Sequence, residues 1–438
     1  MGFDLEKKTS RPSSHAGDSI SSDCASEAGK HNGDLLAERP SQGSSYQAFF
    51  NIVCVVAGTG TLGLPYCLAQ GGWISVGLLV LSMIMSIYTG ILLIKCLYYN
   101  GHTRVASYQE IGHHAFGRWG QGAVWFFHTS VIIGVPVMFF ILSGTEISNL
   151  TKDKIPGVSK AAWIWICCCV VSVPFVFMKT LREVSLLSIF GVLATAVLVG
   201  VAMVESIVDF PNRVPFEYDI VVIRNLPTVI ATLSVCFGGN VVYMHVEEAM
   251  RHPRSFNKVF AWAMIFCCLM YVLVAIPGYM TYGPFAKSPI LSSLPENASR
   301  KIATIMIIAH VLLAAPVLMT SFALEIERIL NVTIERRGRV QERIWRTIIR
   351  LGIMGIVGGI ACLVPFFDSF LSLLGAFGNC MLIYVMPIGF YWKLIGWRTM
   401  KWYELGWCAI VLVIGLLVCV IGSIDAIKAL HKDLTQGR

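Results

Sequence analysis

Eleven apolar stretches dominate this chain, and each is long enough to cross a lipid bilayer. They cover approximately residues 46–70, 72–97, 120–148, 161–178, 184–207, 226–247, 259–281, 301–326, 347–364, 367–391 and 403–425. A span of about 20 apolar residues matches the hydrocarbon core of a membrane, and only 14% of the 438 residues are charged. The sequence therefore predicts an all-α protein that crosses the membrane eleven times.

The distribution of charge predicts how the spans are oriented. Residues 1–45 hold ten serines and no apolar run, so we expect a disordered tail and not a cleaved signal. If this tail is cytosolic, 23 of the 34 Lys and Arg residues fall on the cytosolic side, as the positive-inside rule requires. The net charge of +8 thus reflects orientation, and no nucleic acid partner is expected. The arginines from Arg328 to Arg350 are expected to anchor a loop beside anionic lipid, and residues 426–438 to form a short non-cytosolic tail.

The first span carries the pattern that most directly indicates function. Residues 57–65 read Ala-Gly-Thr-Gly-Thr-Leu-Gly-Leu-Pro. Three glycines and a proline within nine residues disfavour a continuous helix. In hydrocarbon, an interrupted helix is tolerated only where its freed backbone is buried in protein or lines a cavity. Secondary transporters bind substrates at such discontinuous helices.

A second interruption, Phe237-Gly238-Gly239-Asn240, lies in the sixth span, five spans after the first. The two breaks occupy matching places in two five-span halves, 46–207 and 226–391, which an extra helix at 403–425 follows. Because five is an odd number, the second half crosses the membrane in the opposite sense. The sequence therefore predicts an inverted repeat.

Three other patterns are given purely structural interpretations. The amphipathic segment 107–117 is too polar to span and is expected to lie at the cytosolic interface. It contains His113 and His114, but adjacent residues do not share a helical face, so no metal site is expected. The Gly355-x-x-x-Gly359 pattern in span nine is expected to serve close helix packing.

An ordered set of motifs resembles the amino acid/auxin permease family. The set begins with Phe50-Asn51, Gly58-Thr59-Gly60-Thr61-Leu62-Gly63-Leu64-Pro65-Tyr66 and Gly71-Gly72-Trp73, and continues with Ser107-Tyr108 to Ala115-Phe116-Gly117, Phe237-Gly238-Gly239 to Glu247-Glu248-Ala249-Met250, Tyr279-Met280-Thr281-Tyr282-Gly283, Pro365-Phe366-Phe367, Leu374-Gly375 and Met386-Pro387. The resemblance covers about residues 46–425. It implies a LeuT-like fold of two inverted five-helix repeats plus an eleventh helix, and it implies transport of amino acids.

The two breaks indicate how a zwitterionic amino acid would bind. A helix that restarts near Gly60 presents unpaired amides and its positive dipole end to the carboxylate. Half-helices that end near Ala57 and Phe237 present carbonyls to the ammonium. The expected substrate site comprises Ala57, Gly58, Thr59, Gly60, Thr61 and Leu62, then Cys236, Phe237, Gly238, Gly239 and Asn240, with wall residues Val131, Gly134 and Ser321. Neither break contains a charged side chain, which favours a neutral substrate.

The sequence favours a proton as the coupling ion. In the sodium-coupled branch of the family, an Asn and a Thr look like the ion ligands, and Cys54 and Ala314 stand at those positions here. Neither offers a hard oxygen, although Thr320 and Ser321 carry hydroxyls one turn further on. No cofactor or metal is expected. The candidate proton carriers are ionisable residues within spans, namely His128, Glu146, His245 and His310.

The leading hypothesis is a proton-coupled carrier for neutral amino acids. A receptor of the same fold with little flux and a sodium-coupled carrier are the alternatives. An enzyme is not expected, because the spans hold no convergent set of His and Asp residues. The partners are then an amino acid and membrane lipid. The motifs suit a vacuolar or a plasma membrane protein with a cytosolic amino terminus, and they leave the direction of transport and the oligomeric state open.

Overall fold

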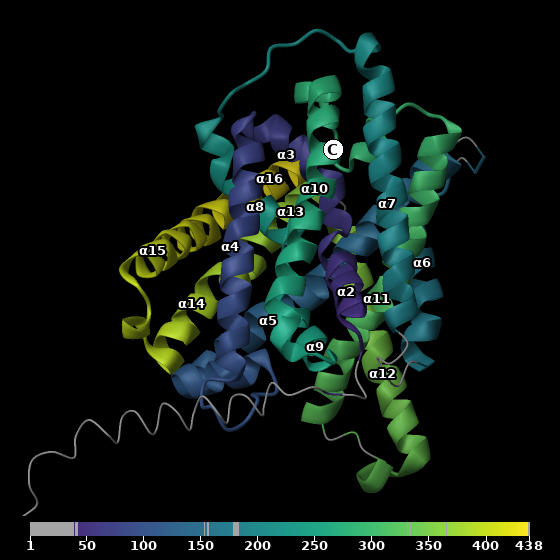
Figure 1. The fold of residues 1–438 in the computed structure, drawn as a ribbon. Helices are drawn as coiled ribbons and strands as arrows, with labels where there is room; N and C mark the ends of the chain where they lie inside the picture. Colours follow the sequence, from purple (N-terminus) through teal and green to yellow (C-terminus); the bar gives the residue numbers. More distant parts are fainter. Residues whose placement is uncertain are drawn as a thin grey trace, which may run out of the picture.

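The computed structural model describes residues 39, 43–152, 154–155, 157–177, 184–330, 332, 334–364 and 366–436. Within these residues the fold is all-helical (Figure 1) and contains no strand; one isolated bridge pairs Gly43 with Met250. Most of the predicted tail, residues 1–38 and 40–42, lies outside the described residues, as does Pro365 of the tenth-span motif.

The described helices follow the predicted spans closely. Ten are long and apolar enough to cross a membrane, and a bent pair at the amino terminus gives an eleventh. The elements used below are α2 (Ser45–Val56), η1 (Thr59–Gly63), α3 (Leu64–Gly71), α4 (Ile74–Leu97), α5 (Tyr108–Thr151), α6 (Lys160–Phe177), α7 (Val184–Asp209), α8 (Leu226–Cys236), α9 (Asn240–Glu248), α10 (Phe256–Tyr282), η6 (Ile290–Ser292), α11 (Ala298–Ile329), α12 (Ile334–Leu363), α13 (Phe367–Leu373), η7 (Leu374–Asn379), η8 (Met381–Val385), α14 (Met386–Tyr391), α15 (Trp402–Leu417), η11 (Val418–Gly422) and α16 (Ser423–Gln436).

Both predicted interruptions are present. α2 ends at Val56, and the chain passes through Ala57 and Gly58 in non-helical conformations before the helix resumes at an angle of 40°. Pro65 stands in the first turn of α3, where its missing N–H breaks no helical hydrogen bond. The sixth span is likewise divided, because α8 ends at Cys236 and α9 begins only at Asn240.

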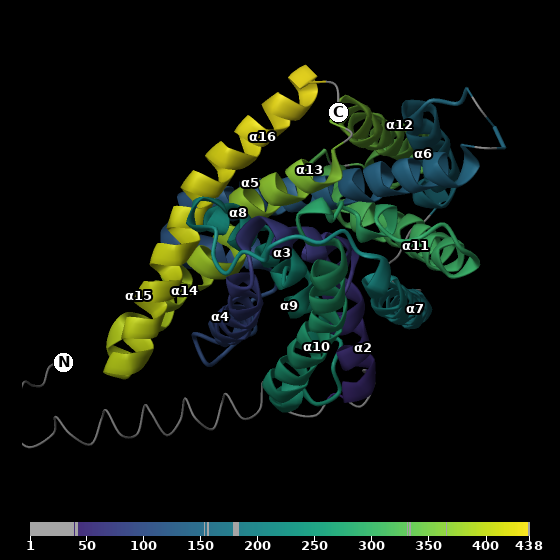
Figure 2. The same cartoon turned by 90° about the horizontal axis from the view of Figure 1, so that it is seen from above.

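The two broken spans lie side by side in the middle of the bundle. η1 packs against α8, α2 packs against α9, and α10 packs against both α2 and α3. On the far side of the breaks, α5 and α11 pack against each other, and α7 contacts α2, α10 and α11. Figure 2 shows α2, α9 and α10 together on one side and α5, α6, α11 and α12 together on the other.

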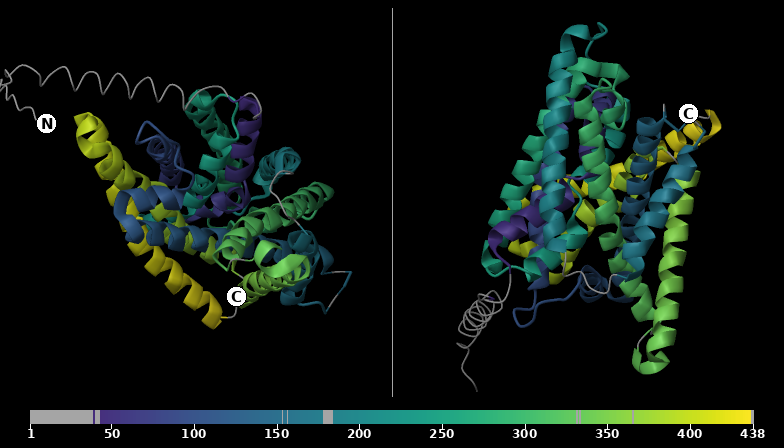
Figure 3. Two further views of the ribbon diagram at one scale, coloured as in Figure 1. Left: turned by 90° about the horizontal axis from the view of Figure 1, so that it is seen from below. Right: turned by 90° about the vertical axis from the view of Figure 1, so that its right-hand side faces the viewer.

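The last span is longer than the sequence suggested. α15, η11 and α16 follow one another from Trp402 to Gln436 and cross one edge of the molecule as a single rod (Figure 3). The expected tail at 426–438 is therefore helical as far as residue 436. The hydroxyl of Ser369 on α13 donates to Oδ2 of Asp433 at 2.6 Å, which fixes the end of the rod to the bundle.

The segment expected at the cytosolic interface is joined to the third span. Tyr108 begins a helix that Ser107 caps, since the Ser107 hydroxyl accepts from the Glu110 N–H at 3.2 Å. This helix is the start of α5, which kinks at Phe116 and Gly117 and then continues to Thr151. Gly117 permits the kink because its φ of +63° is strained for other residues.

Two arginines that were expected beside lipid headgroups instead hold helices together. Arg350 is completely buried, its Nε donates to Oε1 of Glu327 at 2.8 Å, and its Nη1 donates to the Phe175 carbonyl at 2.6 Å. The Nε of Arg346 donates to the other oxygen of Glu327 at 3.1 Å. The carboxylate at the end of α11 thus draws α12 inward, which the spacing of the basic residues did not reveal.

The expected packing role of Gly355 and Gly359 is also wrong. A methyl group built on either glycine meets nothing within 4 Å among the described residues. Both glycines therefore lie on a face of α12 that no described segment approaches closely.

Candidate substrate site

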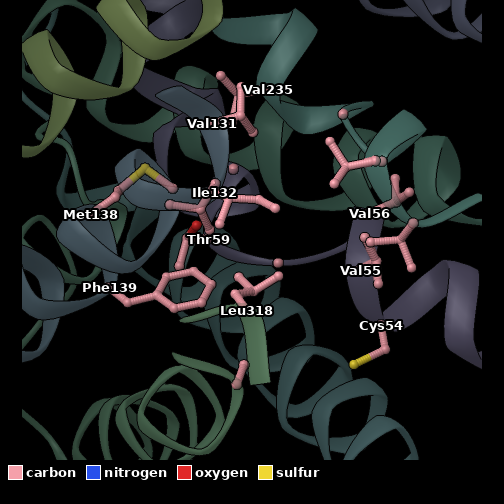
Figure 4. Close-up of a pocket in the computed structure, with 18 of the residues that line it drawn as sticks. Cys54, Val55, Val56, Thr59, Val131, Ile132, Met138, Phe139, Val235 and Leu318 are labelled. Carbon is pink, nitrogen blue, oxygen red and sulfur yellow. The ribbon is translucent and has the colours of Figure 1, made fainter. Parts of the chain in front are cut away.

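A cavity of about 180 Å³ lies between the two broken spans (Figure 4). Gly58, Thr59 and Gly60 of the first break line it, and so do Gly238 and Gly239 of the second. The remaining lining comes from α2, α5, α8, α9, α11 and η7, through Cys54, Val55, Val56, Val131, Ile132, Val135, Met138, Phe139, Val235, Val241, Val242, His310, Leu313, Ala314, Val317, Leu318 and Asn379. Both interruptions predicted from the sequence thus meet at one cavity.

The first break lines this cavity at the point where a helical segment begins. Thr59 and Gly60 begin a helical segment, so their N–H groups lack intrahelical acceptors. Gly60 also touches the second break, because a Cβ at Gly60 would lie 2.9 Å from the Cys236 sulfur. Thr61 and Leu62, two other expected site residues, are buried behind the cavity and do not line it. Leu62 belongs to an apolar cluster that includes Ile290 of η6.

The carbonyl ends of the half-helices are already engaged by hydroxyl groups. The Tyr271 hydroxyl on α10 lies 2.6 Å from the carbonyl oxygens of both Val56 and Cys236. The Thr195 hydroxyl on α7 donates to the Ala57 carbonyl at 2.9 Å. These carbonyls were expected to be free for an ammonium group. Sequence reasoning missed Tyr271 and Thr195, because each lies on an ordinary apolar helix with no local signal.

The prediction of the residues that form the cavity wall is only partly confirmed. Val131 lines the space, but Gly134 faces Leu374, whose side chain would lie 2.5 Å from an added methyl. Phe237 turns away and its ring packs edge-on to Tyr271 at 5.4 Å. Ser321 donates to its own helix, at the Val317 carbonyl. The cavity walls contain Ile132, Val135, Met138, Phe139 and Leu318 in their place.

The residues of the second break fall into two groups, those that line the cavity and those that pack beside it. Gly238 and Gly239 line the space, whereas Cys236 and Asn240 are buried beside it. The Asn240 amide donates to the Leu382 carbonyl at 3.0 Å, so it ties α9 to the tenth span. Asn379 of that same span does line the cavity, and the sequence reading did not include it.

His310 is the one candidate proton carrier among the four that reaches the cavity. It is 4% exposed and lies against α7, where a methyl on Gly191 would come within 2.6 Å of both His310 Nδ1 and the Cys54 sulfur. Glu146 is buried elsewhere and accepts from the Ser292 hydroxyl at 3.4 Å. His245 is largely exposed, with Nδ1 4.0 Å from Glu248.

His128 does not line the cavity, although it lies on α5 one turn before Val131. Cys54 and Ala314, the residues at the two positions where the resemblance implies sodium ligands, do line it. The Thr320 hydroxyl is buried and finds no hydrogen-bond partner in the described part of the chain.

A cluster around Glu247 closes the end of α9 that lies farthest from the cavity. Arg104 Nε donates to Oε2 of Glu247 at 2.8 Å, while the Tyr98 hydroxyl donates to Oε1 at 2.5 Å. Arg39 approaches the same Oε1 at 3.5 Å and donates to the Glu248 carbonyl at 3.0 Å. Glu247 was expected to anchor this end, and these contacts join it to the loop after α4 and to the segment that precedes α2.

The same contacts shift the pKa values of the groups in this cluster. Burial and the hydrogen bond to Glu247 raise the pKa of Tyr98 to about 12. Burial acts to lower the pKa of Arg104, but the hydrogen bond and negative charge of Glu247 outweigh it and raise the pKa. The Arg104 guanidinium therefore stays charged at neutral pH beside Glu247.

The fold and the cavity define a multi-pass integral membrane protein with about ten spans. The family model of transmembrane amino acid transporter proteins matches residues 41–428, so the chain belongs to that family. This confirms the resemblance found in the motifs. Members of the family are transporters and not enzymes.

Several characterised relatives extend over nearly the whole chain. The amino acid transporter AVT1H of Arabidopsis thaliana is 29% identical over 94% of this chain and 96% of its own length. AVT1B of the same plant is 25% identical, with 89% of this chain and 71% of its own length aligned. The vesicular GABA transporter of Caenorhabditis elegans is 24% identical over 93% of this chain and 84% of its own length.

Proposed function

We propose that this protein carries neutral amino acids across a membrane by proton-coupled secondary transport. The observation that carries the proposal is the cavity that meets both helix breaks and whose lining contains no Lys, Arg, Asp or Glu side chain among the described residues. A buried charge on the substrate would need a partner of opposite sign. A zwitterion needs none, because helix-start amides suit its carboxylate and carbonyl oxygens suit its ammonium.

The proposed arrangement is a LeuT-like pair of inverted repeats, 46–207 and 226–391. Breaks in spans one and six, five spans apart and adjacent in space, support this reading. Transport would then proceed by alternating access, with the half-helices tilting around the cavity. The amides near Gly58–Gly60 are the proposed carboxylate ligands. The ammonium is proposed to share the carbonyls near Ala57 and Phe237 with the hydroxyls that now cap them.

Proton coupling is supported by the ionisable group that the cavity holds. His310 lines it, and so do Cys54 and Ala314, which offer no side-chain oxygen at the two positions where the resemblance implies an Asn and a Thr in the sodium-coupled branch. One proton moved down one pH unit supplies about 1.4 kcal/mol, which sustains roughly tenfold accumulation. We propose that His310 carries this proton, with His128, Glu146 and His245 as weaker candidates.

Orientation and membrane are part of the same proposal. The amino terminus is proposed to be cytosolic, on the strength of the distribution of Lys and Arg. The protein is proposed to act in a vacuolar or plasma membrane, and its direction of transport would follow from that location. Two alternatives are an amino acid receptor of the same fold and a sodium-coupled carrier.

Uptake into proteoliposomes tests the proposal. Purified protein is given a panel of labelled neutral, acidic and basic amino acids under an imposed pH gradient, with sodium or choline as the external cation. We expect accumulation of neutral amino acids that collapses with the pH gradient and is unchanged by choline. Loss of uptake in choline would instead indicate sodium coupling. Binding without counterflow of a preloaded amino acid would identify a receptor.

A further inference from the structure

Asn379 brings a carboxamide into the cavity from the tenth span. It is the last residue of the π-helical segment η7, it lines the cavity, and it is 4% exposed. Asn379 therefore places a polar side chain at an otherwise mostly apolar surface.

Close packing fixes Asn379 against the second helix break. A methyl group built on Gly238 would lie only 2.9 Å from Nδ2 of Asn379. The backbone behind the amide is held as well, because the Ser234 hydroxyl donates to the Gly375 carbonyl at 3.0 Å. A Cβ at Gly375 would lie 2.0 Å from the Ala231 carbonyl oxygen. α8 thus sets the position of the amide, and the same α8 ends at the break.

The Asn379 amide has unused hydrogen-bonding capacity. Among the hydrogen bonds within the described part of the chain, none involves its side chain, whereas the Asn240 amide donates to the Leu382 carbonyl. A carboxamide offers two N–H donors and one acceptor oxygen. Leaving such groups unpaired in apolar surroundings is unfavourable. The two buried asparagines differ in what they face: Asn240 donates to the tenth span and does not line the cavity, whereas Asn379 lines it and makes no side-chain hydrogen bond within the described part of the chain.

The rest of the cavity wall indicates which part of a substrate Asn379 would recognise. Val131, Val135, Met138 and Leu318 offer only apolar contact to a substrate side chain. We propose that Asn379 selects neutral amino acids whose side chain ends in a hydrogen-bonding group, above all a carboxamide, over aliphatic ones of the same length. This rests on the proposed function. Two amides can pair donor to acceptor in both directions, whereas an aliphatic side chain leaves Asn379 unpaired.

The test compares glutamine with methionine, which are similar in length but differ in hydrogen bonding. Transport efficiency is measured for both in proteoliposomes with wild-type protein and with Asn379→Leu, which keeps the size and removes the amide. We expect the ratio of glutamine to methionine efficiency to fall at least tenfold, because the substitution removes both hydrogen bonds of the amide pair. Asn225→Leu is the matched control, because its amide donates to the Gln70 carbonyl at 2.9 Å outside the cavity and its loss should leave the ratio unchanged.

The outcomes separate this inference from the proposed function. If wild-type vesicles accumulate neither amino acid, the proposed function fails. If they accumulate both and Asn379→Leu keeps the wild-type ratio, the role of Asn379 is refuted while the function stands. If Asn379→Leu does not insert, Asn379→Ala in detergent is titrated with each amino acid. Thermal stabilisation by glutamine should then be lost more than stabilisation by methionine, and an equal loss overturns the inference.

Discussion

Replacing Gly60 with alanine should damage transport through a single added methyl group. In the structure, a Cβ at this position would lie 2.9 Å from the sulfur and 3.1 Å from the Cα of Cys236. Favourable contacts between such atoms begin near 3.5 Å. The sulfur can rotate away, but the Cα belongs to the backbone at the end of α8. The two breaks must therefore separate by about 0.5 Å.

The size of the effect follows from that displacement. Overpacking by one methyl group in a well-packed interior costs about 1–3 kcal/mol, and here the strain falls on both halves of the substrate site. A misplacement of about 1 Å at an active site can cost 100-fold in rate. We therefore expect Gly60→Ala to lower transport efficiency about tenfold, and Gly60→Leu to abolish uptake while the protein still inserts.

The assay is initial-rate uptake in proteoliposomes, normalised to inserted protein. Gly355→Ala is the matched control, since a methyl there meets nothing within 4 Å in the described structure and uptake should be unchanged. If Gly60→Ala transports as well as the control, the close approach of the two breaks has no functional role. The reasoning would also fail if Gly60→Ala lowered uptake only by preventing insertion.

Three further predictions address groups around the site. Tyr271→Phe removes the hydroxyl that the Val56 and Cys236 carbonyls share, so we expect at least tenfold weaker uptake in proteoliposomes. Unaltered uptake would show that transport does not need this link between the two half-helices. His310→Ala should flatten the dependence of uptake on pH, and a pH profile that keeps its wild-type shape would remove His310 as the proton carrier. Tyr98→Phe should cost about 1 kcal/mol of stability at neutral pH, seen as a lower Tm. Because the pKa of Tyr98 is raised to about 12 from an ordinary value near 10, the protonated hydroxyl stabilises the fold fully below pH 10. That contribution is lost as the pH rises through 12. If wild type and Tyr98→Phe still differ in Tm above pH 12, the stabilising role of the protonated Tyr98 hydroxyl is contradicted.

The positions of the two breaks could be predicted because their causes are local. Glycine and proline weaken a helix wherever they stand, and the interruptions at Gly58 and Gly238 appear in the structure where the sequence placed them. The membrane supplies the second constraint, since about 20 apolar residues must form a span. Local chemistry and one external length scale were therefore enough to locate the spans and the two breaks, although the third span begins earlier and the last one ends later than expected.

The groups that complete the site could not be predicted in the same way. Tyr271 lies more than 200 residues from Val56, and Asn379 lies about 140 residues from Gly238. Their contacts depend on how α10 and η7 pack, and helix periodicity does not specify that packing. The same reason explains Arg350, which looked like a lipid anchor in its basic run but pairs with Glu327. Sequence patterns identified the helices, whereas side-chain partners across helices required the structure.

An experimental density map of the protein with a transported amino acid bound is the most direct measurement. We expect the amino acid between Gly58–Gly60 and Gly238–Gly239, with its carboxylate toward the amides that begin η1. Density for the ligand at any other place, or a first span that runs unbroken through residues 57 and 58, would contradict it.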